Sequence, residues 1–247
     1  FGFLFFKGPM LQILGFSSAP SSSYVASPAK QEMKAYLSTM VGDNETVWEG
    51  ILPQYNMEFR PAKMIIYNDR VNMPGGYADA RMGPFYLPAN ETIYIDPSFF
   101  NEMKEKFGAT GDFAEAYVVA HEYGHHIQHI MGRLTQLHNS NGKVSKRDYN
   151  RLSVRVELQA DFLAGVFAHH ADETFKQFLE TGDIEEAMRC AEAIGDDRLQ
   201  QQAQGHVVRD SFTHGTSKQR AHWFNKGYST GNLKDGEALY SLPYDKL

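Results

Sequence analysis

The chain has 247 residues, of which 42% are hydrophobic, with a formal net charge of −6 and a pI of about 5.9. This length is enough for one large domain or two small ones. The acidic balance argues against nucleic acid as a partner, because phosphate backbones are bound by basic surfaces. The single cysteine, Cys190, cannot form an internal disulfide and fits the apolar face of a helix as a small core residue.

The first 29 residues differ in composition from the rest. Residues 1–16 are apolar, but a Lys-Gly-Pro sequence interrupts them, and they fall short of the roughly 18 residues that span a bilayer. We interpret them as the remnant of a membrane anchor or as an amphipathic segment docked on the domain. Residues 17–28, rich in Ser, Ala and Pro, are predicted to be a linker. Residues 30–247 are expected to form a single domain.

Several helices and strands are predicted in chain order. The first helix is expected over 28–40, with Ser27 as cap and Pro28 in its first turn. A second helix is expected over 44–54, and a short one over 98–107. Strands are predicted at 63–67, 84–87 and 91–96, and a turn at 73–76. Residues 135–146 are predicted to be a surface loop, and 183–204 a helix capped by Asp183.

A central helix is predicted between Asp112 and Gly132. Asp112 is a favourable N-cap, Glu115 follows it with capping-box spacing, and Gly132 is a typical C-terminal stop. The first half of this segment is mostly apolar, as expected for a helix buried in the centre of a domain.

This helix contains the sequence His121-Glu122-Tyr123-Gly124-His125. On a helix, His121 and His125 lie on one face and can point two imidazoles at one metal ion. Glu122 lies about 100° round the helix, where it can hold a water molecule and take its proton. This is the H-E-x-x-H pattern of zinc peptidases. The alternative is an ordinary core helix, which would leave a buried glutamate without a partner.

The third metal ligand determines the class of zinc peptidase. Zincins with three histidines have a glycine and a further histidine where this chain has Gln128 and Met131, so that class is excluded. A second helix, predicted over 148–170, instead supplies two carboxylates four residues apart on an apolar face.

We predict that Glu157 is the third metal ligand and that Asp161 accepts a hydrogen bond from a ligand imidazole. Both carboxylates need such partners if they are buried. Two alternatives remain open. Asp161 is the ligand in place of Glu157, or Glu157 pairs with an arginine such as Arg151 or Arg155.

With these residues the chain resembles the bacterial neutral zinc metallopeptidases, which are usually membrane-anchored. The resemblance extends from about residue 47 to residue 231. It rests on segments 83–86, 93–96, 98–100, 111–114, 121–125, 153–161, 193–197 and 211–217. It implies an α+β, predominantly helical, zincin-like fold, with a small antiparallel or mixed sheet before the active-site helix. It also implies Zn²⁺ and a place in the cell envelope, with the N-terminus in the membrane and the catalytic domain outside the cytoplasm.

Members of the family often have cysteines at positions where this chain has Met73 or Pro74, Leu87, Phe162 and the Gly236 region. The disulfides that the resemblance implies are therefore absent here. None of these positions is a predicted zinc ligand, so the predicted chemistry is unaffected.

The resemblance also suggests how a substrate is held. In zincins an edge strand before the motif helix binds the extended peptide through backbone hydrogen bonds. We predict that residues 92–95 are this strand; the alternative is an inner strand. The segment 212–220 resembles the Thr-His-Pro segment of membrane-linked zincins. His214 is therefore predicted to donate to the oxyanion or to hold substrate, unless it only caps the helix at Ser217. Arg220 is predicted to pair with a carboxylate near the site.

The predicted function is that of a zinc-dependent endopeptidase acting on peptide or protein substrates. Two alternatives belong to other classes: a zinc-stabilised envelope scaffold without turnover, and a zinc amidase that cleaves non-peptide substrates. The intact Glu122 favours an enzyme.

Overall fold

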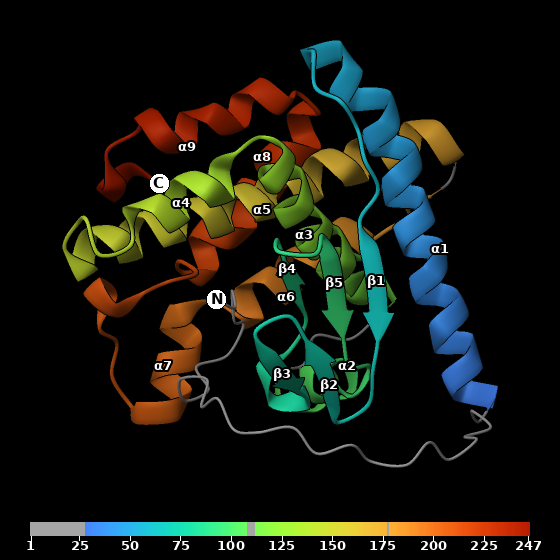
Figure 1. The fold of residues 1–247 in the computed structure, drawn as a ribbon, viewed down its shortest axis with the longest axis horizontal. Helices are drawn as coiled ribbons and strands as arrows, with labels where there is room; N and C mark the ends of the chain where they lie inside the picture. Colours follow the sequence, from blue (N-terminus) through green and yellow to red (C-terminus); the bar gives the residue numbers. More distant parts are fainter. Residues whose placement is uncertain (1–27, 108–111, 177) are drawn as a thin grey trace.

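The structure, a computed structural model, describes residues 28–107, 112–176 and 178–247 (Figure 1). The predicted N-terminal anchor, the linker and the Ser27 cap lie outside these residues, so membrane association and an envelope location stay predictions. Within the described ranges, no helix is both long enough and apolar enough to cross a bilayer.

The fold is predominantly helical with a small amount of sheet, which confirms the predicted α+β class. The long helices are α1 (Pro28–Ile51), α3 (Asp112–Ile130), α5 (Lys146–Phe175) and α8 (Ser217–Thr230). The shorter helices are α2 (Ser98–Glu102), α4 (Arg133–Ser140), α6 (Asp183–Ala193), α7 (Asp196–Gln204) and α9 (Ala238–Ser241). The strands are β1 (Lys63–Ile66), β2 (Arg70–Met73), β3 (Gly76–Asp79), β4 (Phe85–Leu87) and β5 (Thr92–Ile95).

The three-stranded sheet has the order β1-β5-β4, with β5 parallel to β1 and antiparallel to β4. The prediction that residues 92–95 form the edge strand is therefore wrong, because β5 is the central strand. All four of its residues are buried, as expected for a strand that is paired and covered on both sides. The strand nearest the motif helix is β4, which lies at an edge of the sheet and contacts α3. The predicted turn at 73–76 joins β2 and β3 into a hairpin.

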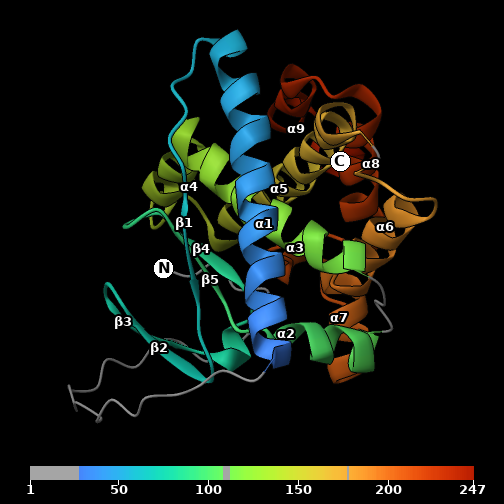
Figure 2. The ribbon, with the colours of Figure 1, turned by 90° about the vertical axis from the view of Figure 1, so that its right-hand side faces the viewer.

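Helix α1 covers the region where two helices were predicted, and it lies along one flank of the molecule beside β1 (Figures 1 and 2). Its buried positions are Leu37, Met40, Asn44, Val47, Trp48 and Ile51. Their spacing of three or four residues continues through Gly42, so packing of this face outweighs the low helix propensity of one glycine. The helix gives way to a 3₁₀ turn at Leu52–Tyr55.

The predicted surface loop at 135–146 is also wrong in its first half, since residues 135–140 lie in α4. Leu134 and Leu137 are buried on one face of this helix, and that burial stabilises it despite its polar sequence.

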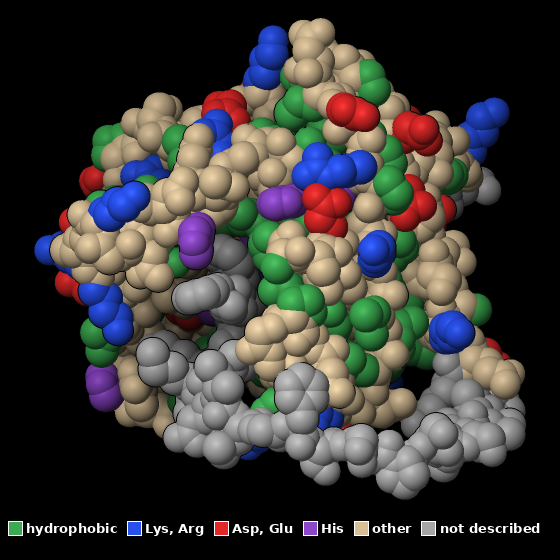
Figure 3. Space-filling model, viewed as in Figure 1, with side chains coloured by type: hydrophobic (Ala, Val, Ile, Leu, Met, Phe, Trp, Pro, Cys, Tyr) green, Lys and Arg blue, Asp and Glu red, His purple; other side chains and the backbone are tan. Residues whose placement is uncertain are grey.

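Figure 3 shows the surface of the molecule in the view of Figure 1. Positive and negative side chains are interspersed on this face, and hydrophobic side chains gather over the sheet. Ile65 of β1 is 38% exposed.

The predicted helix over 183–204 is divided into α6 and α7 at Gly195. A Cβ atom on Gly195 would lie 2.3 Å from the backbone nitrogen of Ser217, so α8 begins directly against this break. The break lets Asp196 and Asp197 turn toward the start of α8, where Asp197 accepts hydrogen bonds from the backbone and hydroxyl of Ser217.

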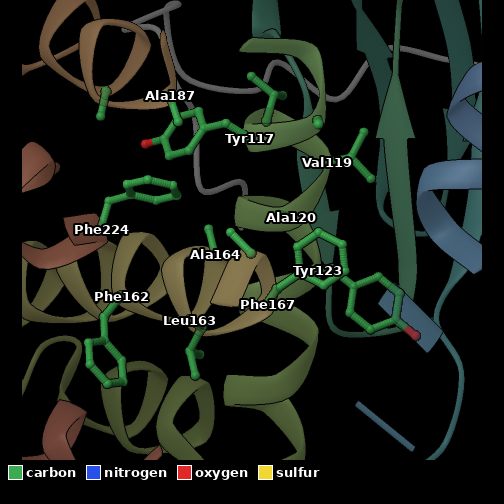
Figure 4. Packing of buried hydrophobic residues seen from close by; sticks show 14 of the residues in the cluster. Tyr117, Val119, Ala120, Tyr123, Phe162, Leu163, Ala164, Phe167, Ala187 and Phe224 are labelled. Carbon is green, nitrogen blue, oxygen red and sulfur yellow. The ribbon is translucent and has the colours of Figure 1, made fainter. Parts of the chain in front are cut away.

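The centre of the molecule is built from α3, α5 and α8. Helix α5 packs closely against both of the others, and its contacts are made at glycines. A Cβ atom on Gly124 of α3 would lie 3.0 Å from the carbonyl oxygen of Ala160 on α5. Helices α3 and α8 meet through Tyr117 and Phe224, whose rings pack edge to face with their centroids 5.5 Å apart (Figure 4).

Candidate metal centre

The structure brings together the three predicted metal ligands. His121 and His125 lie on α3, and Glu157 lies on α5, with all three side chains at most 2% exposed. The Nε2 atom of His121 is 3.4 Å from Oε2 of Glu157, and Nε2 of His125 is 3.7 Å from Oε1. We call these residues the buried trio; one ligand atom from each lies within 4.8 Å of the others.

The close crossing of α3 and α5 places these side chains. Gly124 lies between the two histidines in sequence, and because it lacks a side chain, α5 can approach at Ala160. Glu157 and Asp161 lie on either side of Ala160 in the chain, so the approach directs both carboxylates toward the histidines. The spacing of the motif and the contact between the helices thus produce one site.

Asp161 holds the ring of His121. Its Oδ1 atom is 2.8 Å from Nδ1 of His121, so that nitrogen donates and Nε2 faces Glu157. The same carboxylate accepts two hydrogen bonds from Arg220, at 2.8 and 2.9 Å, and one from the Tyr117 hydroxyl at 2.5 Å. The prediction that Arg220 pairs with a carboxylate near the site is confirmed.

Gln128 holds the ring of His125 in the same way. Its Oε1 atom is 2.8 Å from Nδ1 of His125, which leaves Nε2 facing Glu157. The Gln128 amide in turn donates to the carbonyl of Val156 at 2.6 Å and to Gln159 at 3.0 Å. Both imidazoles are therefore fixed in orientation by a hydrogen bond from the nitrogen remote from Glu157, the arrangement seen around metal-ligating histidines.

The donor set fits a zinc ion. With both Nδ1 atoms donating, neutral rings present two nitrogen lone pairs to a buried carboxylate, an arrangement that a metal ion or a proton between them stabilises. In the protein alone, burial opposes the charge of His125, but Glu157 outweighs it and raises the pKa of His125 to about 9. Two imidazole nitrogens and a carboxylate oxygen, with a coordination position left over, are a common ligand set for catalytic zinc.

Glu122 is buried beside this trio. Neither of its carboxylate oxygens accepts a hydrogen bond from any residue that the structure describes. Burial raises the pKa of Glu122, although the nearby His125 and His121 oppose the increase. A buried carboxylate without a protein donor indicates a site for a polar group, such as water, that the protein does not itself supply.

The structure also places His214 in this environment. Burial lowers the pKa of His214, but its hydrogen bond to Asp196 and the charge of Glu157 raise it overall. Its Nδ1 atom is 3.2 Å from Oδ1 of Asp196, and the backbone N–H groups of Thr213 and His214 donate to Oδ2 at 2.6 and 2.7 Å. His214 does not cap α8, because Thr216 does so.

The alternative partners of Glu157 are engaged elsewhere. Arg155 donates to the carbonyl oxygens of Leu239 and Leu242, and the guanidinium of Arg151 lies over the ring of Tyr244. The alternative in which Asp161 is the ligand fits less well, because Arg220 and Tyr117 already contact its oxygens.

Sequence reasoning missed the roles of Gln128 and Asp196 in orienting the site. Gln128 has a local signal, because it lies three residues after His125 on the same helix. Asp196 has none, since it reaches His214 only through the break between α6 and α7.

Two histidines from one helix and a glutamate from a second define the class of glutamate-ligated zincin-like sites. The sequence profile of the family described as "Putative neutral zinc metallopeptidase" matches residues 11–239. The chain belongs to this family.

Two relatives are similar over most of the chain. The uncharacterized protein YpfJ of Escherichia coli strain K12 is 44% identical over 215 residues, which cover 87% of this chain and 74% of YpfJ. The uncharacterized protein Rv2575 of Mycobacterium tuberculosis strain H37Rv is 41% identical over 199 residues, which cover 76% of this chain and 64% of that protein. No solved structure matches the chain significantly.

Proposed function

We propose that the protein is a zinc-dependent endopeptidase, with His121, His125 and Glu157 as the metal ligands. The observation that supports this most strongly is Glu122, a buried carboxylate without a protein hydrogen-bond donor in the described chain, beside three residues suited to zinc. A scaffold that used zinc only for stability would have no need of such a group.

Bound zinc would supply a Lewis acid that polarises the scissile carbonyl and acidifies a water molecule. Glu122 acts as the general base: it takes a proton from the attacking water and delivers it to the leaving nitrogen. Its raised pKa suits this role, because a base with a pKa closer to the working pH also returns the proton more readily.

Two neighbouring groups keep the ligand rings in place. Asp161 and Gln128 each accept the Nδ1 proton of one ligand histidine, so the Nε2 atoms stay directed toward Glu157. Nδ1 of His214 is 3.2 Å from Oδ1 of Asp196, and the raised pKa of His214 favours the protonated ring, in which Nε2 is also a donor. In our proposal His214 donates from Nε2 to the oxyanion that forms on the scissile carbonyl.

We place the extended substrate along β4 rather than β5. An edge strand offers unpaired backbone groups to a peptide, and β4 is the edge strand that contacts the motif helix. Tyr86 holds β4 against α3, because its hydroxyl is 2.9 Å from Nδ1 of His126. The Nε2 atom of His126 is 2.7 Å from the carbonyl oxygen of Arg60.

Hydrolysis of an unfolded protein tests the proposal. The purified chain is incubated with reduced, alkylated casein, with a zinc chelator and then with zinc restored. We expect cleavage that stops with the chelator and returns with zinc, and mass spectrometry should place the cuts at internal peptide bonds. Absence of cleavage at every zinc load would contradict an endopeptidase and favour a scaffold. Release of acyl groups from small amides alone would favour the amidase alternative.

A further inference from the structure

A second group of metal-binding side chains lies far from the buried trio. His169, His170 and Glu173 are in the C-terminal part of α5, and their side chains are 30%, 29% and 65% exposed. We call them the surface trio. Glu157 lies twelve residues earlier on the same helix, which corresponds to about 18 Å at 1.5 Å per residue. The two groups therefore cannot share one ion.

The tautomers of both histidines are fixed by the end of α8. Nδ1 of His169 is 2.7 Å from the carbonyl oxygen of Tyr228, and Nε2 of His170 is 2.8 Å from that of Gly231. A carbonyl oxygen only accepts hydrogen bonds, so each of these nitrogens has the proton. In the neutral rings, the proton-free nitrogens are Nε2 of His169 and Nδ1 of His170.

These two nitrogens face Glu173. They lie 3.7 and 3.3 Å from its carboxylate oxygens, and one ligand atom from each residue lies within 4.8 Å of the others. Two nitrogen lone pairs and a carboxylate that converge in this way repel one another unless a cation lies between them. Either a proton or a metal ion meets this need.

The rings of His169 and His170 are held in fixed positions, which favours the binding of a metal ion between them and Glu173. His169 packs directly on Gly231, where a Cβ atom would lie only 2.3 Å from the ring, and Gly231 has a φ of +56° as the C-terminal cap of α8. The two imidazoles meet edge to face with centroids 4.9 Å apart. Because both rings are already oriented, the two histidines lose little conformational entropy when the site binds an ion.

We propose that the surface trio is a second metal site that binds a divalent first-row transition ion, Zn²⁺ in the first place, through His169 Nε2, His170 Nδ1 and a Glu173 oxygen. The backbone carbonyls that hold the other ring nitrogens play the part that outer-shell acceptors play in metal sites. Two nitrogens and one oxygen suit zinc better than calcium or magnesium. Solvent reaches the trio, so water completes the coordination.

An ion at this site would fasten the C-terminal part of α5 to the last turn of α8. These two helices also supply Glu157, Asp161 and Arg220, so the ion stabilises the helix pair that supports the buried centre. Its effect is structural and does not depend on whether the buried trio is catalytic.

Zinc binding to wild type and to Glu173→Gln tests the proposal. Glu173 is exposed, so this variant should fold normally, which circular dichroism checks. Glu180→Gln, another exposed position, is the matched control. Equilibrium dialysis against buffered free zinc gives the number and affinity of sites. We expect the affinity of the surface site for zinc to be at least about tenfold weaker in Glu173→Gln. At a free zinc concentration that fills this site in wild type, wild type and Glu180→Gln should each bind one zinc equivalent more than Glu173→Gln.

Equal zinc stoichiometry and affinity in all three proteins would overturn the proposal, as would an absence of zinc from the surface trio in wild type. The latter result would mean that a proton alone neutralises the group. The test measures a difference between proteins with the same buried trio, so it stays informative even if that trio fails to bind zinc or to support hydrolysis.

Discussion

At the scale of single residues, Asp161 connects the candidate metal centre to the packing of the helices. One buried carboxylate both fixes the ring of His121 and neutralises Arg220, which is fully buried. Burial opposes the charge of Arg220, but Asp161 and Tyr117 raise its pKa well above the ordinary value. Removing the negative charge therefore affects stability and metal binding together.

Asp161→Asn should lower the free energy of unfolding by about 3–5 kcal/mol, because it leaves a buried guanidinium without its counter-charge. It should also weaken zinc binding by about 10–100-fold, since His121 loses its charged acceptor. Urea denaturation and zinc titration measure the two effects. The exposed Asp245→Asn serves as control and should change stability by less than about 0.5 kcal/mol. Equal stability of the two variants would contradict this account of Arg220.

The pair of Asp196 and His214 predicts how stability depends on pH. Burial opposes both charges, but their hydrogen bond and charges raise the pKa of His214 above 6.5 and lower the pKa of Asp196 below 3.8. The His214 contribution is full below pH 6.5 and is lost as the pH rises through its folded-state pKa. The Asp196 contribution is full above pH 3.8 and is lost as the pH falls through its folded-state pKa.

Asp196→Asn should therefore destabilise the metal-free protein most between about pH 4 and 6.5, by about 1.5–3 kcal/mol for the loss of charged hydrogen bonds. The difference from wild type should shrink on both sides of this range. Urea denaturation of both proteins across the pH range measures it. A difference that does not change with pH would show that the pair contributes through its backbone contacts alone.

The sequence predicted the residues of the site that follow a local pattern. His121, Glu122 and His125 are defined by helical spacing, and Glu157 and Asp161 by two carboxylates on one apolar face, so the structure brings together residues already identified. Asp196 could not be predicted, because it reaches His214 through the interruption between α6 and α7. This interruption lies at Gly195, against which α8 packs.

At the scale of secondary-structure elements, the contact between α5 and α8 depends on two glycines. A Cβ atom on Gly165 would lie 2.0 Å from the carbonyl oxygen of Phe224, and one on Gly227 would lie 2.0 Å from that of Phe162. Backbone atoms cannot yield at such distances, so a side chain at either position separates the helices.

Gly227→Ala should destabilise the protein by about 3 kcal/mol or more, at or beyond the usual cost of overpacking, because the clash is with backbone. Gly42→Ala is the matched control. It lies inside α1 with no atom within 4 Å of the added Cβ, and should stabilise by about 0.5–1 kcal/mol. Thermal unfolding of both variants gives the comparison. A stabilised Gly227→Ala would contradict the observed helix contact.

The errors in predicting elements have a common physical cause. The sequence of α1 contains a glycine that suggests a break, and α4 is polar enough to suggest a loop, yet buried residues on one face of each hold them helical. Whether β5 lies at the edge or in the centre of the sheet depends on which strands pair with it. Local propensity does not contain this information, because the helical state of α1 and α4 and the position of β5 in the sheet all depend on tertiary contacts.

At the scale of the whole molecule, the three central helices form one support for the site. Helix α3 supplies two histidines and Glu122, α5 supplies Glu157 and Asp161, and α8 supplies the arginine that neutralises Asp161. The segment between α7 and α8 adds His214. Long elements packed at glycine contacts hold these groups more rigidly than loops would, as the proposed catalytic role requires.

In our proposal Glu122 is the base of a zinc peptidase. Zinc content and hydrolysis of an unfolded protein, measured side by side for wild type and Glu122→Gln, test it most directly. We predict equal zinc in both proteins and hydrolysis reduced at least about 100-fold in the variant, the lower end of what a general base contributes. Hydrolysis by Glu122→Gln at the wild-type rate, or no zinc at the buried trio in either protein, would contradict the claim.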